Sequence, residues 1–87
     1  MGALGEVFEI TSSTTYSGNG SLFWIYIHAT ADTTVTVADD TDEKISLYQA
    51  ADTSGPITVF TPAIRVKTSL KVTISGTAKV SLCHNVS

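Results

Sequence analysis

Hydrophobic and polar residues alternate with a period of two along most of the chain, which is the spacing of a half-buried β-strand. The clearest run is Leu70–Ser75, in which every second residue is a large aliphatic one. Ala78–Cys83 repeats the pattern immediately after the dipeptide Gly76-Thr77. Since two residues are the usual length of a tight hairpin loop, we predict that these two runs form an antiparallel β-hairpin.

Six further short runs have the composition or the alternation of strands. Turn residues separate them, above all at Ser17–Gly20 and at Ser54–Pro56. The six predicted strands are Val7–Thr11, Leu22–Ala29, Thr34–Val37, Ile45–Tyr48, Ile57–Phe60 and Ile64–Lys67. No window has the three-and-four spacing of an amphipathic helix, and only residues 49–52 are a candidate for a single helical turn.

Short strands separated by turns at intervals of roughly 8–12 residues are typical of a β-sandwich or barrel. The chain has 87 residues, which is enough for one domain only. We therefore predict an all-β fold over residues 1–87, a small antiparallel β-sandwich of seven or eight strands. Its connectivity is expected to be that of a jelly roll or Greek key, with an Ig-like arrangement as the alternative. Residues 1–5 are expected to form a flexible arm.

The composition narrows the possible classes of protein. The chain contains 14 Thr and 10 Ser residues, and only 15% of its residues are charged. This argues against a helical bundle, whose exposed face would carry Glu, Lys, Gln and Arg. The longest uncharged stretch, Ile10–Ala31, is interrupted by polar residues, so we expect no transmembrane helix. The first residues lack the basic and apolar segments of a signal peptide, and we expect none.

The formal net charge of −3 disfavours binding of nucleic acid through a general basic field. The charges are unevenly distributed along the chain. One Lys and all eight acidic residues lie at or before Asp52, a balance of 1 − 8 = −7, whereas the four other basic residues follow position 64 and give +4. This asymmetry predicts either two oppositely charged faces of one body or packing of identical copies through opposite charges.

The predicted strand Leu22–Ala29 is unusual because it is apolar on both faces. The set that makes the better core face consists of Phe23, Ile25, Ile27 and Ala29. The other set consists of Leu22, Trp24, Tyr26 and His28. In a two-layer sandwich this second set would point outward and place a Leu, a Trp and a Tyr side by side on the surface. Exposed apolar patches of that kind usually mark a binding surface.

Three explanations for this outward row stay open. Another part of the same chain covers it, another protein subunit covers it, or it stacks against a sugar. The second explanation is favoured by residue type, because Trp and Tyr are enriched at interface hot spots. It is also favoured by size, because a domain this small buries only about 60–65% of the surface of its unfolded chain. We therefore expect a homo-oligomer or permanent attachment to a larger assembly.

Catalytic chemistry is not indicated by any group of residues. Cys83 is the only cysteine, so no intrachain disulfide is possible. In an extended strand Cys83 and His84 point to opposite faces and cannot form a catalytic dyad. The acidic run Asp39–Glu43 lacks the spacing and the glycine of a calcium loop, and we interpret it as a solvated turn in preference to a metal site. We predict no enzymatic activity and no cofactor.

Four segments of the chain resemble small virion proteins of tailed bacteriophages. They are Trp24–Ala29, Thr34–Asp40, Phe60–Val66 and Leu70–Ser81, the last of which contains a Leu-x-Val-x-x-Ser-Gly pattern. Proteins of this kind are short β-sandwiches or jelly rolls that decorate or cement a capsid or sit on the tail. The resemblance covers residues 22–83 and has no counterpart for residues 1–20.

The resemblance implies a non-enzymatic capsid decoration or cement protein that bridges neighbouring capsid subunits. Such a protein is made in the host cytoplasm and located on the capsid surface of the virion. The implied partners are other copies of the chain and a major capsid protein, with no nucleic acid and no membrane. The residues that we expect at the interface are Leu22, Trp24 and Tyr26 as apolar anchors and Arg65, Lys67 and Lys71 as rim charges. The alternative is a carbohydrate-binding β-sandwich module that uses Trp24 and Tyr26.

Overall fold

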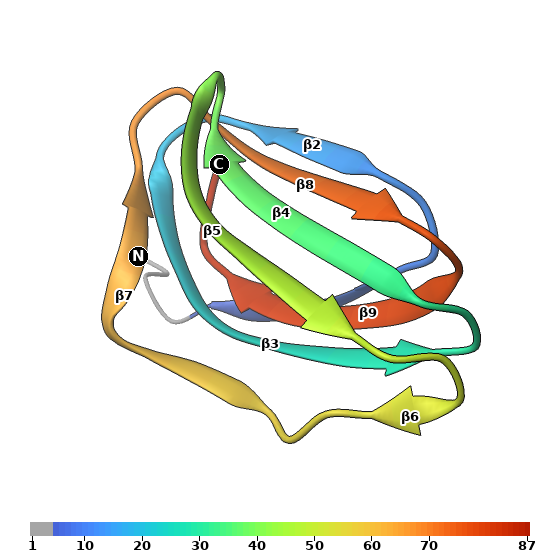
Figure 1. Ribbon diagram of the computed structural model, residues 1–87. Coiled ribbons are helices and arrows are strands. Elements are labelled where there is room, and N and C mark those ends of the chain that lie inside the picture. Colours follow the sequence, from blue (N-terminus) through green and yellow to red (C-terminus); the bar gives the residue numbers. More distant parts are fainter. Residues whose placement is uncertain (1–4) are drawn as a thin grey trace.

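The computed structural model describes residues 5–87, which form an all-β structure with no helix among them (Figure 1). The strands are β1 (Glu6–Ile10), β2 (Thr14–Ser17), β3 (Gly20–Ala29), β4 (Thr33–Asp39), β5 (Asp42–Gln49), β6 (Thr53–Ser54), β7 (Thr58–Val66), β8 (Ser69–Ser75) and β9 (Ala78–His84). The predicted all-β class is confirmed. Within the described part of the chain there is no long apolar helix that could span a membrane. Apart from Gly5, the predicted arm over residues 1–5 lies outside the described residues.

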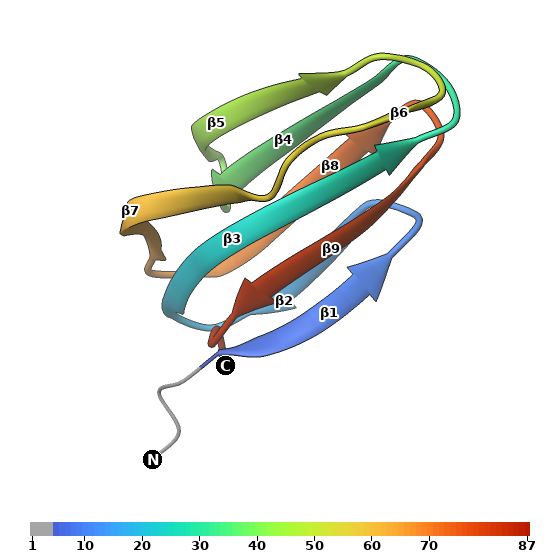
Figure 2. The ribbon, with the colours of Figure 1, turned by 90° about the horizontal axis from the view of Figure 1, so that it is seen from below.

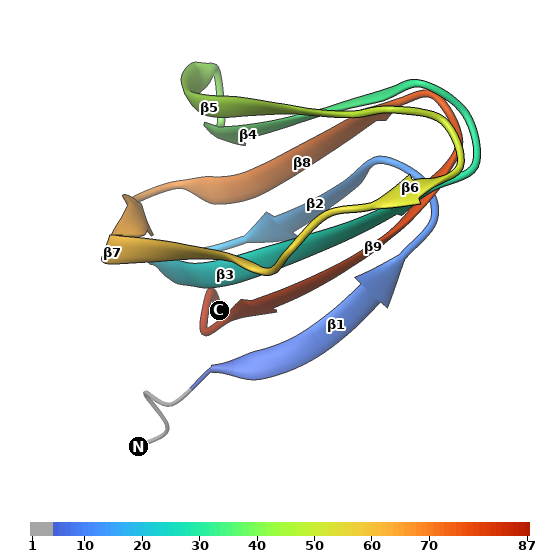
Figure 3. The ribbon, with the colours of Figure 1, turned by 60° about the horizontal axis from the view of Figure 1, so that its bottom comes forward.

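The strands form two antiparallel sheets that pack face to face (Figure 3). Sheet A has the order β1-β9-β3, with β6 and β7 both on the free edge of β3, and sheet B has the order β2-β8-β4-β5. Because β6 pairs with the last residues of β3 and β7 with its first residues, the two occupy one position in sheet A. Each sheet therefore has four strand positions, in the order of an eight-stranded jelly roll. Of the predicted connectivities, the jelly roll is the one observed.

The number of strands differs from the predicted seven or eight for identifiable reasons. Thr14–Ser17 pairs with β8 as strand β2, although it contains no aliphatic residue that would mark it. The strands predicted at residues 57–60 and 64–67 are a single strand, β7, with an irregular stretch opposite β3. Residues 49–52 form no helical turn, because they end β5 and lead through a tight turn to the two-residue strand β6.

The predicted hairpin over residues 70–83 is wrong. β8 pairs with β2 and β4 in sheet B, whereas β9 pairs with β1 and β3 in sheet A. Gly76-Thr77 therefore carries the chain from one sheet to the other. The carbonyl oxygen of Thr77 accepts hydrogen bonds from the backbone N–H groups of Thr30 and Ala31, at 3.0 and 3.3 Å. Two strands bury every second residue both when they pair within one sheet and when they face each other across the core. The alternation of residues alone therefore could not distinguish a hairpin from a crossing between the sheets.

Four connections cross between the sheets at one end of the sandwich, on the right in Figure 3. They join β1 to β2, β3 to β4, β5 to β6 and β8 to β9. The opposite end carries the β4–β5 hairpin, the β2–β3 and β7–β8 connections and the residues that follow β9. The two ends of the sandwich therefore differ.

The core lies between the two sheets and is built almost wholly from Leu, Ile, Val and Ala. Its buried members are Leu22, Ile25, Ile27, Ala29, Val35, Val37, Val66, Leu70, Val72, Ala78, Val80, Leu82 and Val86. Phe8, Tyr16 and Phe60 pack against this cluster as partly buried aromatic residues. The alternation predicted for residues 34–37, 70–75 and 78–83 is therefore confirmed as an alternation of core and surface.

A β-bulge at Phe23 changes which residues of β3 face the core. Leu22 is opposite His84, but Trp24 is opposite Cys83, so Phe23 is an extra residue without a partner in the ladder. Such an insertion shifts the alternation by one position. As a result Leu22 is 0% exposed and belongs to the core, and the prediction that it lies in the outward row is wrong. Phe23, predicted to be a core residue, is only partly buried and outside the core cluster.

Some residues of the early acidic part of the chain lie beside residues of the later basic part. Glu9 of β1 lies 3.9 Å from Lys79 of β9, which joins an early acidic residue to a late basic one. Asp39 of β4 accepts a hydrogen bond from the backbone of Lys67 at the β7–β8 turn. Because the jelly-roll order places early strands beside late ones, charges that are far apart in the sequence become neighbours.

Candidate interaction surface

The outer surface of sheet A carries a row of apolar residues that crosses all four strand positions. The register aligns Val7 of β1, Cys83 of β9, Trp24 of β3 and Val59 of β7. Residues that are directly opposite in a sheet point to the same side. Their neighbours Leu82 and Ile25 are in the core, so this row points away from it (Figure 2, in which sheet A faces the viewer).

The bulge adds a second aromatic ring to this surface. A Cβ atom built on Gly5 would lie 2.8 Å from the Sγ atom of Cys83 and 3.0 Å from two ring atoms of Phe23. Because Cys83 points outward, the Phe23 ring next to it also lies on the outer side of sheet A. We call the surface formed by Val7, Phe23, Trp24, Tyr26, Val59 and Cys83 the aromatic face.

The aromatic face is apolar from one edge of the sheet to the other and has polar rows beside it. Val7 and Val59 at its two edges are 64% and 66% exposed, whereas Phe23, Trp24, Tyr26 and Cys83 are half-buried. The next row lies toward the end of the sandwich at which the four connections cross. It consists of Tyr26, Ser81 and Glu9, in that order across β3, β9 and β1. The next row consists of Lys79, His28 and Ser54. An apolar patch with polar residues beside it is typical of protein–protein contact surfaces.

The outer surface of sheet B has a different character. Its cross-strand rows join Thr36 to Thr73 and Ser46, and Thr34 to Ser75 and Tyr48. Hydroxyl groups on a sheet surface can hydrogen-bond to water, and such a surface is stable without a cover. The two faces of the sandwich are therefore unequal, and only sheet A presents a central apolar patch.

The three basic residues predicted at one rim lie on different surfaces. Arg65 is opposite Ser21 on the outer side of sheet A, the side that carries the aromatic face. Lys71 is opposite Thr15 and Ala38 on the outer side of sheet B, because its neighbours Leu70 and Val72 are both 0% exposed. Lys67 lies in the turn between β7 and β8. The prediction of a common rim is wrong, and only Arg65 stays with Trp24 and Tyr26.

The acidic run Asp39–Glu43 forms the end of β4, the hairpin turn and the start of β5. The Asp39 carboxylate accepts hydrogen bonds from the backbone N–H groups of Lys67, Thr68 and Ser69 at 2.9, 3.0 and 3.3 Å. The bonds from Lys67 and Thr68 hold the pKa of Asp39 below its ordinary value. Across residues 5–87, His, Cys, Asp and Glu side chains form no group of three that could hold a metal ion. Asp39 thus fixes the β7–β8 turn.

Replacing Asp39 with Asn should lower the melting temperature at pH 7, because one neutral amide oxygen cannot replace a carboxylate that accepts three N–H groups. Since the folded pKa is depressed, the carboxylate stabilises the fold above its ordinary pKa of about 3.9, and this contribution disappears as pH falls through the lower folded value. Thermal melts between pH 7 and about pH 2.5 should therefore show the two proteins converging in acid. Asp40→Asn, in the β4–β5 turn directly after Asp39, is the matched control, and we expect little change in its melting temperature.

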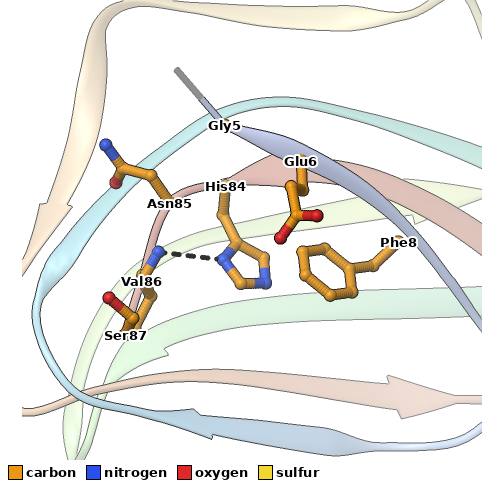
Figure 4. A pocket seen from close by; sticks show the side chains of 7 residues that line it. All are labelled: Gly5, Glu6, Phe8, His84, Asn85, Val86 and Ser87. Carbon is orange, nitrogen blue, oxygen red and sulfur yellow. Dashed lines mark hydrogen bonds between the residues drawn. The ribbon is translucent and has the colours of Figure 1, made fainter. Parts of the chain in front are cut away.

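A cavity of about 310 Å³ opens at the hairpin end of the sandwich (Figure 4). Its lining residues are Gly5, Glu6, Phe8, His84, Asn85, Val86 and Ser87. His84 is 2% exposed, and its ring stacks on Phe8 with centroids 4.3 Å apart and packs against Tyr16 at 4.2 Å. Burial lowers the pKa of His84 below its ordinary value, and the charge of Glu6 acts in the opposite direction. From the sequence, His84 was considered only as a catalytic partner of Cys83, and that pairing was rejected. Cys83 points to the opposite face of sheet A, as predicted.

A second cavity, of about 210 Å³, opens between β5 and the segment that joins β6 to β7. It is lined by Ile25, Ile27, Leu47, Tyr48, Gln49, Gly55, Pro56 and Thr58. No charged side chain is among them. Tyr48, which lines this cavity, and Ile57, which lies between Pro56 and Thr58 of its lining, are 64% and 54% exposed.

No family model matches the chain, and comparisons with curated proteins and with solved structures also find no match.

Proposed function

We propose that the protein is a non-enzymatic structural protein of a virion, which attaches to a capsid shell and to other copies of itself through the aromatic face. The observation that carries the proposal is the position of Trp24. Its ring lies on the outside of sheet A, outside the core cluster, in a row with Val7 and Val59, which are largely exposed. A large aromatic residue in the centre of an apolar patch is the usual composition of an interface hot spot.

The proposed mechanism follows from the arrangement of this surface. A decoration protein stabilises a shell by burying surface across the junction of neighbouring subunits, so that separating them exposes apolar area to water. Phe23, Trp24 and Tyr26 would supply most of that area. Arg65 and the Glu9–Lys79 pair lie on the same side of the sandwich and would fix the orientation of the partner more than its affinity. The hydroxyl-rich surface of sheet B would face solvent.

A carbohydrate-binding module is the alternative, because jelly rolls occur in lectins as well as in viral capsids. A sugar site needs polar groups beside the stacking ring to bind the sugar hydroxyls. The cross-strand neighbours of Trp24 are Cys83 and Val59, and Val7 lies beyond Cys83 in the same row; none of the three offers such a group. Tyr26 has Ser81 and Glu9 in its row and is the better candidate for a sugar contact. The apolar surroundings of Trp24 favour the contact with protein.

Replacing Trp24 with Ala should leave the fold intact and weaken self-association at least about 30-fold, because a hot-spot Trp contributes about 2 kcal/mol or more to binding. Light scattering after size-exclusion chromatography, over a range of concentrations, measures the association, and circular dichroism checks the fold. Thr73→Ala, on the outer surface of sheet B, is the matched control and should associate like the wild type.

The outcomes separate the candidate functions. A wild-type protein that stays monomeric at every concentration, or a Trp24→Ala protein that associates normally, contradicts the role of the aromatic face. Binding of the monomer on a glycan array, abolished by Tyr26→Ala, supports the carbohydrate module. A coding sequence located between genes for a capsid and a portal protein supports the virion assignment, and one located among genes for sugar-degrading enzymes contradicts it.

A further inference from the structure

The segment Asn85–Ser87, which follows β9, folds back over the hairpin end of the sandwich. The backbone N–H of Asn85 donates to the carbonyl oxygen of Ser21 at 3.1 Å, and that of Ser87 donates to the carbonyl oxygen of Asn19 at 3.2 Å. The side-chain Oδ1 of Asn85 accepts the N–H of Ser21 at 2.7 Å. Val86 between them is 8% exposed and belongs to the core. We call this segment the clasp.

The clasp fits closely against the loop between β2 and β3. A Cβ atom on Gly18 would lie 2.3 Å from the carbonyl carbon of Ser87, and Gly18 has a φ of 124°, which favours glycine. The loop is therefore shaped to receive the clasp. The clasp is also attached to the side chain of His84.

His84 holds the clasp only in its neutral form. The N–H of Val86 donates to Nδ1 of His84 at 3.0 Å (Figure 4, dashed line). Since Nδ1 accepts this bond, the proton of the neutral ring is on Nε2. Nε2 is buried and has no hydrogen-bond partner in the part of the chain that the structure describes.

Protonation of His84 would remove the acceptor that Val86 needs. Two N–H groups would then face each other at Nδ1, and a positive charge would lie in a buried ring whose Nε2 has no partner. The titratable groups that face the ring are Glu6 of β1, whose charge attracts the protonated form, and the neutral phenol of Tyr16 of β2. Figure 4 shows Glu6 and Phe8 on one side of the ring and the clasp on the other.

We propose that His84 is a pH-sensitive latch: on protonation it releases the clasp, so that the cavity at the hairpin end opens and the imidazolium reaches water and the Glu6 carboxylate. In the closed state the clasp supplies Asn85, Val86 and Ser87 to the wall of that cavity. In the open state these residues leave the wall, and the end of the core between β1, β2 and β3 becomes accessible. This latch does not depend on the proposed virion role.

Amide hydrogen exchange followed by NMR between pH 7.5 and 5 tests the latch. Because burial lowers the pKa of His84 in the closed state, the protection should begin to fall as the pH drops below the ordinary histidine pKa of about 6.5 and should continue to fall toward the lower closed-state value. After correction for intrinsic exchange rates, the protection of Val86 and Ser87 should fall by up to about tenfold for each further pH unit, which is the limit for a single proton. The protection of core strand amides such as Val35 and Val72 should stay unchanged over the same range.

Variants distinguish a latch from a general loss of stability. His84→Asn places an amide oxygen near the position of Nδ1, and it should keep the clasp closed at every pH in the range. Glu6→Gln removes the charge that attracts the protonated form and should shift the release to lower pH. His28→Gln is the matched control, because His28 is an exposed histidine that contacts Ser54 and lies outside the clasp. It should respond to pH like the wild type.

Two results would overturn the proposal. One is unchanged protection of Val86 while the ring NMR signals show that His84 has become protonated. The other is a simultaneous loss of protection throughout the core strands, because His84 would then be a stabilising residue of the fold and not a latch. A His84→Asn protein that fails to fold leaves the Glu6→Gln comparison as the test, and an unshifted release there also contradicts the proposal.

Discussion

Leu22→Ala is expected to destabilise the protein by about 2–5 kcal/mol, the usual cost of truncating a fully buried Leu. Leu22 is 0% exposed and packs in the core because the bulge at Phe23 turns it inward. For a chain of this size, each kcal/mol lowers the melting temperature by about 4–8 °C. Urea unfolding at 25 °C and thermal melts followed by circular dichroism measure the effect.

The informative comparison is with the next two residues of β3. Phe23→Ala and Trp24→Ala remove larger side chains, but both rings lie on the outside of sheet A, so we expect a smaller loss of stability from each than from Leu22→Ala. A regular strand without the bulge predicts the reverse order for Leu22 and Phe23. If Phe23→Ala proves more destabilising than Leu22→Ala, the bulge assignment is wrong.

Gly76→Ala is expected to destabilise the protein strongly, although it adds only one methyl group. Gly76 has a φ of 126°, a conformation that other residues rarely adopt. A Cβ atom there would also lie 2.4 Å from the carbonyl oxygen of Asp32 and 2.7 Å from Oγ1 of Thr33. Both the β8–β9 and the β3–β4 crossings would have to move apart. We expect a cost of about 2–4 kcal/mol, which combines backbone strain with the loss of close packing.

Gly55→Ala is the matched control for this substitution. A Cβ atom on Gly55 would meet only Oε1 of Gln49, the end of a flexible side chain, and Gly55 has no positive φ. We expect its stability to change by less than about 1 kcal/mol. If urea unfolding shows the same loss of stability for Gly55→Ala and Gly76→Ala, the β8–β9 and β3–β4 crossings do not make the close contact described here.

The sequence predicted the class of fold because alternation reports which side of a strand faces the core, and in an antiparallel sandwich that is the main regularity. It could not predict which strands pair. Leu70–Ser75 and Ala78–Cys83 alternate identically whether they share a sheet or face each other across the core. What decides between the two is the backbone at Gly76 and the hydrogen bonds that Thr77 accepts, neither of which a residue pattern reveals.

The candidate surface was predicted only in part, because the alternation of residues reveals neither a bulge nor the sheet to which a strand belongs. Trp24 and Tyr26 lie on the outside of sheet A as expected, but the bulge exchanges Leu22 and Phe23, and an inserted residue leaves no mark in a strand that is apolar on both faces. Lys71 was placed with Arg65 because both alternate with core residues, although they belong to opposite sheets. The sequence did not single out His84 for the proposed latch, since only its burial and its bond to Val86 distinguish it.

The crossings that join the two sheets also constrain how the chain reaches its native structure. Among the described strands, β4 and β5 are the only sequence neighbours that pair, and every other ladder joins segments separated by at least two connections. β1 finds its partner in β9, so the first and last strands must meet before sheet A is complete. Because so few of its contacts are local, we expect this protein to fold slowly for its length. Among the described strands, the β4–β5 hairpin is the element that can form before the rest is in place.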